Sequence, residues 1–233
     1  MRATARASEA PIWQAASLLL GYPDEQLVAS LPGVRRLLGH VPPDRAGPLL
    51  GLVDHLAGTP MSALQAAYVE TFDTSRRRSL YLTYFAHGDT RKRGTALLRF
   101  KQTYLQAGFQ LDVEDGGELP DHLCVVLEFA ATVDRDLGRR LLLDHRAGLE
   151  LLRIALTDSE SPWAAALRAV TTTLPALRGD ERDAVRRLAA EGPPAEEVGL
   201  TPYGAPAFDA RLEEARQSVA IDLPFPSARA GIR

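Results

Sequence analysis

The chain has 233 residues, 45 % of them hydrophobic and 24 % charged, which is enough for one large domain or two small ones with a proper core. Its formal net charge of −3 gives the molecule as a whole no attraction to nucleic acid or to anionic lipid. The single cysteine, Cys124, excludes an internal disulfide and a cysteine-based metal cluster, and it fits a reducing cytosol.

The first quarter of the chain predicts a series of short helices. The apolar run from Ile12 to Leu20 predicts the first. No cleavage site follows it, and no window reaches about 18 uninterrupted apolar residues, so we expect a cytoplasmic protein with no signal peptide and no membrane insertion. Asp24 caps a second helix that Pro32-Gly33 ends. A third helix, capped by Asp44, stops at Gly58, and a fourth begins at Thr59-Pro60.

The middle of the chain predicts an irregular connection between two helices. Residues 73–89 form this connection and contain one helical turn. Asp89 or Thr90 then caps a helix that ends at Gly108. After an acidic, glycine-rich loop, Leu119-Pro120-Asp121 opens a further helix, whose free amide groups Asp121 or Glu118 can satisfy.

The last third predicts a longer helix from about Arg139 to Leu156, another from Ser161-Pro162, and a polar surface helix over Glu181–Glu191. Residues 192–233 are proline-rich with weak periodicity, which indicates a docked or mobile tail. No run of alternating strand residues is present. The predicted fold is therefore all-α: a single-domain bundle of about eight to ten helices over residues 1–191, followed by the C-terminal segment.

A cluster of basic residues lies in the middle of the chain. Between Glu70 and Lys101 there are eight Lys or Arg residues against three acids, a local net charge of +5. Arginine triplets can neutralise phosphates, and neighbouring aromatic rings can stack on bases. Because the whole chain is acidic, a solvated face, or a face complementary to an acidic partner, is favoured over nucleic-acid binding.

Two short motifs carry titratable side chains. His87 and Asp89, two residues apart, could belong to a metal site or a proton relay, but three or four ligands at a recognisable spacing are missing. Two carboxylates and an imidazole, those of Glu118, Asp121 and His122, lie at the N-terminus of one predicted helix. This arrangement suits a cationic or amide-bearing ligand. No catalytic nucleophile and no phosphate-binding loop is evident, so the residues alone indicate a helical binding protein.

The motifs together carry a resemblance to a known family. The stretch "TFDTSRRRSLYLTYFAHGDTRKRG", followed by "ELPDHLCVVLEF", resembles the NarJ family over about Tyr68 to Ala131. The "LLGYPDE" of Leu19 to Glu25 is similar to that family's opening. NarJ proteins are assembly chaperones of respiratory nitrate reductase, and they are related to the TorD and DmsD chaperones.

The resemblance implies an all-helical, TorD/NarJ-like fold and a non-catalytic role with no cofactor of its own. Such a chaperone binds the apo catalytic (alpha) subunit of nitrate reductase in the cytoplasm, through the subunit's N-terminal segment among other parts. It keeps the subunit competent for insertion of the molybdenum cofactor before membrane docking, and it is absent from the finished enzyme. The alternative from another class is a helical nucleotide- or metal-binding protein with weak hydrolase activity.

A groove between helices is then the expected site for the partner peptide. Aromatic and arginine side chains dominate the energetics of such interfaces, while charged residues at the rim set the register. Several of the aromatic residues lie at helical spacing, so a place in the core is an open alternative for each of them. The residues expected to bind the partner are Tyr68, Phe72, Tyr81, Tyr84, Phe85, His87, Asp89, Arg91, Arg93, Glu118, Asp121 and His122.

Overall fold

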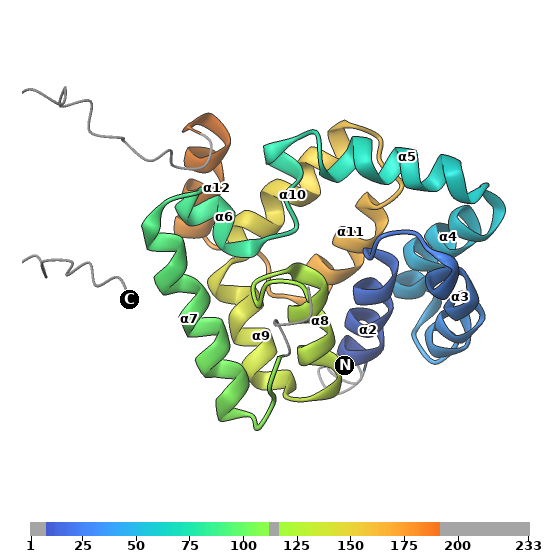
Figure 1. Cartoon of the computed structure of the whole chain (residues 1–233), viewed down its shortest axis with the longest axis horizontal. Coiled ribbons are helices and arrows are strands. Elements are labelled where there is room, and N and C mark those ends of the chain that lie inside the picture. Colours follow the sequence, from blue (N-terminus) through green and yellow to red (C-terminus); the bar gives the residue numbers. More distant parts are fainter. Residues whose placement is uncertain (1–7, 112–116, 192–233) are drawn as a thin grey trace, which may run out of the picture. The chain divides into compact units, whose positions relative to one another are not determined.

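The computed structural model describes residues 8–111 and 117–191, and the helices it contains confirm the all-α prediction. Within these ranges there are eleven α-helices, one more than the upper end of the expected count, with one short 3-10 helix and no β-strand (Figure 1). The elements are α2 (Glu9–Leu19), α3 (Glu25–Leu38), α4 (Pro43–Gly58), α5 (Met61–Phe72), η1 (Arg76–Arg78), α6 (Leu82–His87), α7 (Arg91–Gln106), α8 (Leu123–Thr132), α9 (Arg135–Asp144), α10 (Arg146–Asp158), α11 (Ala164–Thr173) and α12 (Gly179–Glu191).

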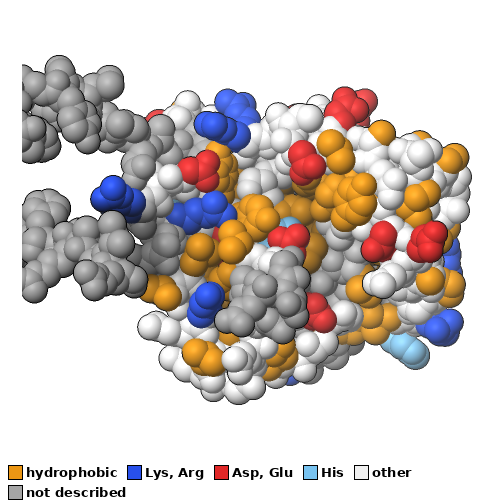
Figure 2. Space-filling model, in the orientation of Figure 1, with side chains coloured by type: hydrophobic (Ala, Val, Ile, Leu, Met, Phe, Trp, Pro, Cys, Tyr) orange, Lys and Arg blue, Asp and Glu red, His pale blue; other side chains and the backbone are white. Residues whose placement is uncertain are grey.

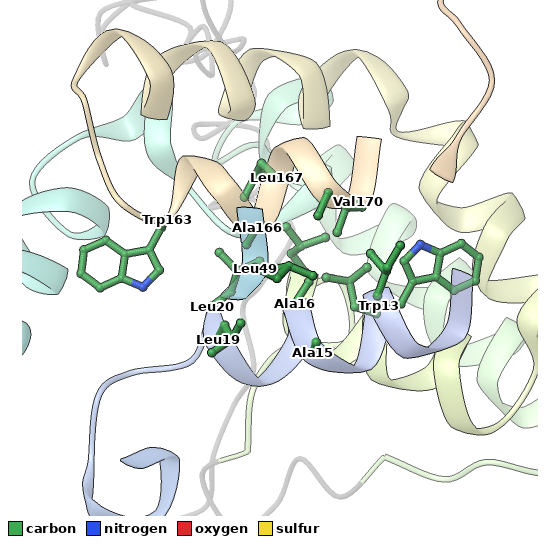
Figure 3. Packing of buried hydrophobic residues seen from close by; sticks show 14 of the residues in the cluster. Trp13, Ala15, Ala16, Leu19, Leu20, Leu49, Trp163, Ala166, Leu167 and Val170 are labelled. Atoms are coloured by element: carbon green, nitrogen blue, oxygen red, sulfur yellow. The ribbon is translucent and has the colours of Figure 1, made fainter. Parts of the chain in front are cut away.

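Helix α2 lies at the centre of the packing and contacts α8, α11, α3 and α4. It is apolar on nearly all sides, as expected for a helix surrounded by others. Figure 3 shows its residues Trp13 and Ala16 facing Val170 of α11 and Leu49 of α4. The indole nitrogen of Trp13 donates a hydrogen bond to Thr173 Oγ1 over 2.9 Å, so the ring's one polar group is satisfied inside the core.

Helix α3 continues where the sequence predicted an end. Asp24 caps it as expected, accepting a hydrogen bond from the backbone N–H of Leu27 over 2.7 Å. The prediction that Pro32-Gly33 terminates it is wrong, because α3 runs on to Leu38. The proline removes one helical hydrogen bond. The buried stripe that Leu27 begins extends to Leu38, and burying that second half offsets the loss.

Four other predictions about the helices also differ from the structure. The helix expected from Arg139 to Leu156 is two helices, α9 and α10, separated at His145. The helix expected to open at Leu119-Pro120-Asp121 begins only at Leu123. Asp44 lies in the first turn of α4, and its N-cap is Pro42. The connection over residues 73–89 holds two helical segments, η1 and α6, where one turn was expected.

The polar helix predicted near Glu181 is confirmed as α12, which buries only Val185. Along the part of the chain that the structure describes, none of the helices is both long enough and apolar enough to cross a lipid bilayer. The expected tail over residues 192–233 lies outside the described residues, so the predicted division of the chain at Gly192 stays a prediction.

Candidate functional site

Two segments that are distant in sequence meet where α6 and α8 begin. Tyr81 and His122 form an isolated antiparallel bridge. On either side of it, the N–H of Leu82 donates to Asp121 O over 3.0 Å and the N–H of Leu123 donates to Leu80 O over 2.8 Å. This pairing brings together the two motifs that the sequence singled out separately, "SLYLTY" and "ELPDHL".

A groove with a volume of about 620 Å³ opens beside this bridge. Its walls come from the turn after α2, from α5, from the connection that follows α5, from α6 and from the start of α8 with the segment before it. Figure 2 shows hydrophobic side chains crossing the middle of this face of the molecule, with acidic side chains among them. We call it the aromatic groove; it is lined by Gly21, Tyr22, Tyr68, Phe72, Asp73, Ser75, Arg76, Ser79, Leu80, Tyr81, Tyr84, Asp89, Glu118, His122 and Cys124.

One wall of the groove is a cluster of rings around Tyr68. The ring centroid of Tyr68 lies 5.4 Å from that of Tyr22, 4.6 Å from Phe72 and 5.5 Å from Trp163. Its hydroxyl donates to Leu20 O over 3.0 Å, and burial raises its pKa, so it stays a protonated donor. Tyr22, by contrast, is 50 % exposed. The wall is therefore anchored in the core and ends in an aromatic ring open to a ligand.

The opposite wall couples an aromatic ring to charged groups. The Tyr81 hydroxyl donates to Glu118 Oε2 over 3.0 Å, and burial together with this carboxylate raises the pKa of Tyr81 to about 12. The guanidinium carbon of Arg93 lies 5.2 Å from the centre of the Tyr81 ring, within cation–π range. His122 packs against the same ring at 5.2 Å between centroids.

The imidazole of His122 is neutral near pH 7. Burial lowers its pKa below the ordinary value of 6.5, and this effect outweighs the opposing pull of Glu118 and Asp121. Its Nδ1 atom is buried and has no hydrogen-bond partner among the residues that the structure describes. A buried polar atom without a partner on a groove wall is suited to a hydrogen bond with a bound ligand.

The charged side chains that line the groove are mostly acidic. It is lined by three carboxylates, of Asp73, Asp89 and Glu118, against one guanidinium, of Arg76. Burial raises the pKa of the Cys124 thiol, which leaves it a poor nucleophile. Over the described ranges 8–111 and 117–191, no three His, Cys, Asp or Glu side chains gather closely enough to hold a metal ion.

Seven of the twelve residues predicted to bind the partner line the aromatic groove: Tyr68, Phe72, Tyr81, Tyr84, Asp89, Glu118 and His122. Of the remaining five, His87 ends α6, where Gly88 follows at a positive φ of 56° and the His87 carbonyl accepts a hydrogen bond from Thr90 over 2.8 Å. Arg91 begins α7 on the surface, and Arg93 does not line the groove but contacts two residues that do, Tyr81 and Asp89.

Phe85 does not face the groove as predicted. It is buried against α10, where a methyl group on Gly148 would come within 2.9 Å of its ring. Its free edge lines a separate cavity of about 180 Å³ beside α10 and α12. Successive residues of a helix project about 100° apart around its axis. Phe85 and its neighbour Tyr84 therefore point to different sides of α6, and of the two only Tyr84 lines the groove.

Asp121 is not a rim residue either, because its side chain is 0 % exposed. Its Oδ2 atom accepts hydrogen bonds from the backbone N–H of Thr83 over 3.1 Å and from Thr83 Oγ1 over 2.5 Å, and Arg93 Nη2 lies 3.8 Å away. The carboxylate thus caps the first turn of α6 and not the helix that follows it in sequence. Asp121 builds the groove without being open to a partner.

Eight of the lining residues were not predicted from the sequence, and the aromatic one among them, Tyr22, is half exposed. A signal was present, since Gly21 and Tyr22 belong to the "LLGYPDE" stretch that carries part of the family resemblance. The other missed residues lie in the connection after α5 or beside the bridge: Asp73, Ser75, Arg76, Ser79, Leu80 and Cys124.

Comparisons with known proteins bear on this region. A family model described as "Nitrate reductase delta subunit" matches residues 40–169, which include every groove residue except Gly21 and Tyr22. The "Nitrate reductase-like protein NarX" of Mycobacterium tuberculosis (strain CDC 1551 / Oshkosh) is 41 % identical over 162 residues, which is 70 % of this chain and 24 % of the relative. The chain thus spans about a quarter of that relative's length.

Two further relatives are named as assembly proteins. The "Probable nitrate reductase molybdenum cofactor assembly chaperone NarJ" of Bacillus subtilis (strain 168) is 35 % identical over 163 residues, 70 % of this chain and 87 % of the relative. The "Nitrate reductase molybdenum cofactor assembly chaperone NarJ" of Escherichia coli (strain K12) is 39 % identical over 105 residues, 45 % of this chain and 43 % of the relative. The family model covers more than half of the chain, and the chain belongs to the nitrate reductase delta subunit family, which confirms the NarJ resemblance.

Proposed function

We propose that this chain is a non-catalytic assembly chaperone for respiratory nitrate reductase. It binds the apo catalytic (alpha) subunit in the cytoplasm, including that subunit's N-terminal segment, and keeps it competent for molybdenum cofactor insertion before membrane docking. It needs no cofactor of its own and leaves before the enzyme is finished. The observation that carries the proposal is the 35 % identity to a Bacillus subtilis relative, covered over 87 % of its length, that is named "Probable nitrate reductase molybdenum cofactor assembly chaperone NarJ".

The aromatic groove supports the proposal by its shape and its lining. Rings from the turn after α2, from α5 and from the start of α6 line the groove, and that of Tyr22 is half exposed. An amphipathic segment of the partner can lay its apolar face on this surface, which is the usual way that a helix is held in a groove. Rigid aromatic rings supply such contacts with little loss of side-chain entropy.

The charges of the groove favour a partner segment with basic side chains beside its apolar face. Asp73 and Asp89 are exposed to solvent, and Glu118 already accepts a hydrogen bond from Tyr81. A lysine or arginine entering the groove would meet these carboxylates and the electron-rich faces of the rings. These charges would speed association and select against acidic segments.

The site assignment is tested by calorimetric titration with a peptide that copies the N-terminus of the catalytic subunit from the same organism. We expect the wild-type chain to bind the peptide and not its scrambled form. Tyr22→Ala removes the open aromatic anchor and Glu118→Gln removes a groove charge, so each should raise the Kd about tenfold. Only the loss caused by Glu118→Gln should shrink at high salt.

Matched controls lie away from the groove. Val69→Ala removes an exposed apolar side chain from the outer face of α5, and Asp183→Asn removes an exposed carboxylate from α12. Both should leave the Kd unchanged. Tight binding that neither groove variant affects would show that the peptide binds elsewhere on the chaperone. Absence of binding to both the peptide and the full-length apo subunit would contradict the proposed function itself.

A further inference from the structure

Helix α7 is strongly basic although the chain as a whole is acidic. The residues of α7, Arg91–Gln106, include five Lys or Arg and no Asp or Glu. Helix α12, of similar length, carries three Arg against four acidic residues. The basic character is therefore a property of α7 and not of exposed helices in this protein generally. Figure 2 shows Lys and Arg side chains gathered on the side of the molecule where α6 and α7 lie.

The inner face of α7 is used in packing. Ala96, Phe100 and Tyr104 are buried, and the Tyr104 hydroxyl donates to Pro120 O over 2.6 Å. The Phe100 ring lies 5.0 Å from the imidazole of His145, centroid to centroid. The rotation of α7 about its axis is thereby fixed, so the opposite face is held towards solvent.

Two large apolar side chains stand on that outer face. Leu98 is 57 % exposed and Leu105 is 62 % exposed, and they are the two most exposed of the large hydrophobic residues in the described ranges. They are seven residues apart, which places them on one line along the helix. Successive residues are rotated by about 100° around the helix axis. Lys101 therefore lies on one side of the line through the two leucines, and Lys92 and Arg99 lie on the other side.

The three flanking cations are available for an external partner. Lys92, Arg99 and Lys101 are exposed. Over the stretches of chain that the structure describes, Arg93 of α7 pairs with Asp89 and Asp121, whereas none of the three flanking residues takes part in an ion pair. The outer face of α7 thus has an apolar line bordered on both sides by exposed positive charges that pair with none of the described acidic residues.

This pattern suits a lipid surface better than a partner helix. A second helix would need a second apolar row about half a heptad from the leucines, but those places hold Gly94 and Thr95 and then Lys101 and Gln102. A membrane interface needs no such row. It accepts isolated leucines into the headgroup region and pairs flanking Lys and Arg side chains with lipid phosphates.

We propose that the outer face of α7 docks this protein, reversibly and without insertion across the bilayer, on the surface of an anionic phospholipid membrane. Leu98 and Leu105 enter the interface, and Lys92, Arg99 and Lys101 contact the phosphates. None of the residues of α7 lines the aromatic groove, so the membrane surface and the partner site are separate. The proposal goes beyond the chaperone function and does not depend on it.

Vesicle flotation with the purified full-length chain tests the proposal. We expect the chain to float with vesicles of equal parts phosphatidylcholine and phosphatidylglycerol, and not with vesicles of phosphatidylcholine alone. At about 1 M salt, where the screening length falls to about 3 Å, it should be released. Each cation at an anionic surface contributes roughly a factor of five, so Lys92→Gln/Arg99→Gln/Lys101→Gln should lower the partition coefficient about a hundredfold. Leu98→Ala/Leu105→Ala should lower it about tenfold.

The matched control is Arg182→Gln/Arg186→Gln/Arg187→Gln, which removes the same total charge from exposed positions of α12. It should bind vesicles like the wild-type chain, and circular dichroism checks that all variants are folded. The proposal is overturned if the chain does not float with anionic vesicles, or if the α12 variant loses as much binding as the α7 variant. Binding to an acidic polypeptide such as polyglutamate but not to vesicles would also overturn it, and would mark α7 as a protein-binding face.

Discussion

Gly138→Ala is expected to lower the free energy of unfolding by about 3 kcal/mol, although it adds a single methyl group. Gly138 lies in α9 where this helix crosses α8. A Cβ atom there would come within 2.3 Å of the Ala130 Cβ and 2.5 Å of the Ala130 Cα. Since the obstruction includes backbone, no side-chain rotation relieves it, and the two helices must separate. Chemical denaturation followed by circular dichroism measures the effect.

Gly51→Ala is the matched control for this substitution. Gly51 also lies inside a helix, α4, and a Cβ atom there would meet nothing within 4 Å. Alanine is a better helix former than glycine by about 1 kcal/mol, so Gly51→Ala should leave the stability unchanged or raise it by up to that amount. Equal effects of the two substitutions would mean that α8 and α9 do not pack as closely as described.

Asp121→Ala is expected to destabilise the fold by about 3 kcal/mol, because it leaves buried donors without an acceptor. The substitution removes the acceptor of the Thr83 backbone N–H and hydroxyl, and it removes the buried carboxylate nearest Arg93. The start of α6 then loses its cap, and with it the placement of Tyr81 and Tyr84 on the groove. Thermal unfolding should report the loss of stability, and peptide binding should weaken as a consequence.

The control for Asp121→Ala is the same substitution at Asp89, the other acidic residue that Arg93 contacts. Asp89 lies 3.3 Å from Arg93 Nη1, and its side chain is 70 % exposed. Such a solvated pair contributes little, so Asp89→Ala should cost about 0.5 kcal/mol or less. A stable Asp121→Ala variant that loses only peptide binding would return Asp121 to the rim, as the sequence first indicated.

The elements that the sequence predicted well are those with a local cause. The apolar stripe of α5 repeats at helical spacing, and Asp24 stands three residues before the amide that it caps, so both could be inferred without knowledge of the fold. The end predicted at Pro32 failed because a local breaker competed with a buried stripe that continues beyond it. The division at His145 was missed because apolar residues recur with helical spacing on both sides of it.

The site residues that lie together in a short sequence motif could be predicted. Those whose role depends on a contact with a residue far away in the sequence could not. Tyr81, Glu118 and His122 lie in two compact motifs, and these motifs meet at the bridge. The role of Asp121 depends on Thr83, 38 residues earlier, and no local pattern indicates that pairing. Tyr22 joins the groove through its ring contact with Tyr68, 46 residues later in the chain, and no local pattern indicates that contact.

The proposed function requires the chain to recognise nitrate reductase before its cofactor is in place. Affinity capture with the immobilised full-length chain tests this most directly, using the catalytic subunit of the same organism once in its apo form and once loaded with the molybdenum cofactor. We expect the apo subunit to be retained and then released by the competing N-terminal peptide, while the loaded subunit passes through. Equal retention of both forms, or of neither, would contradict it.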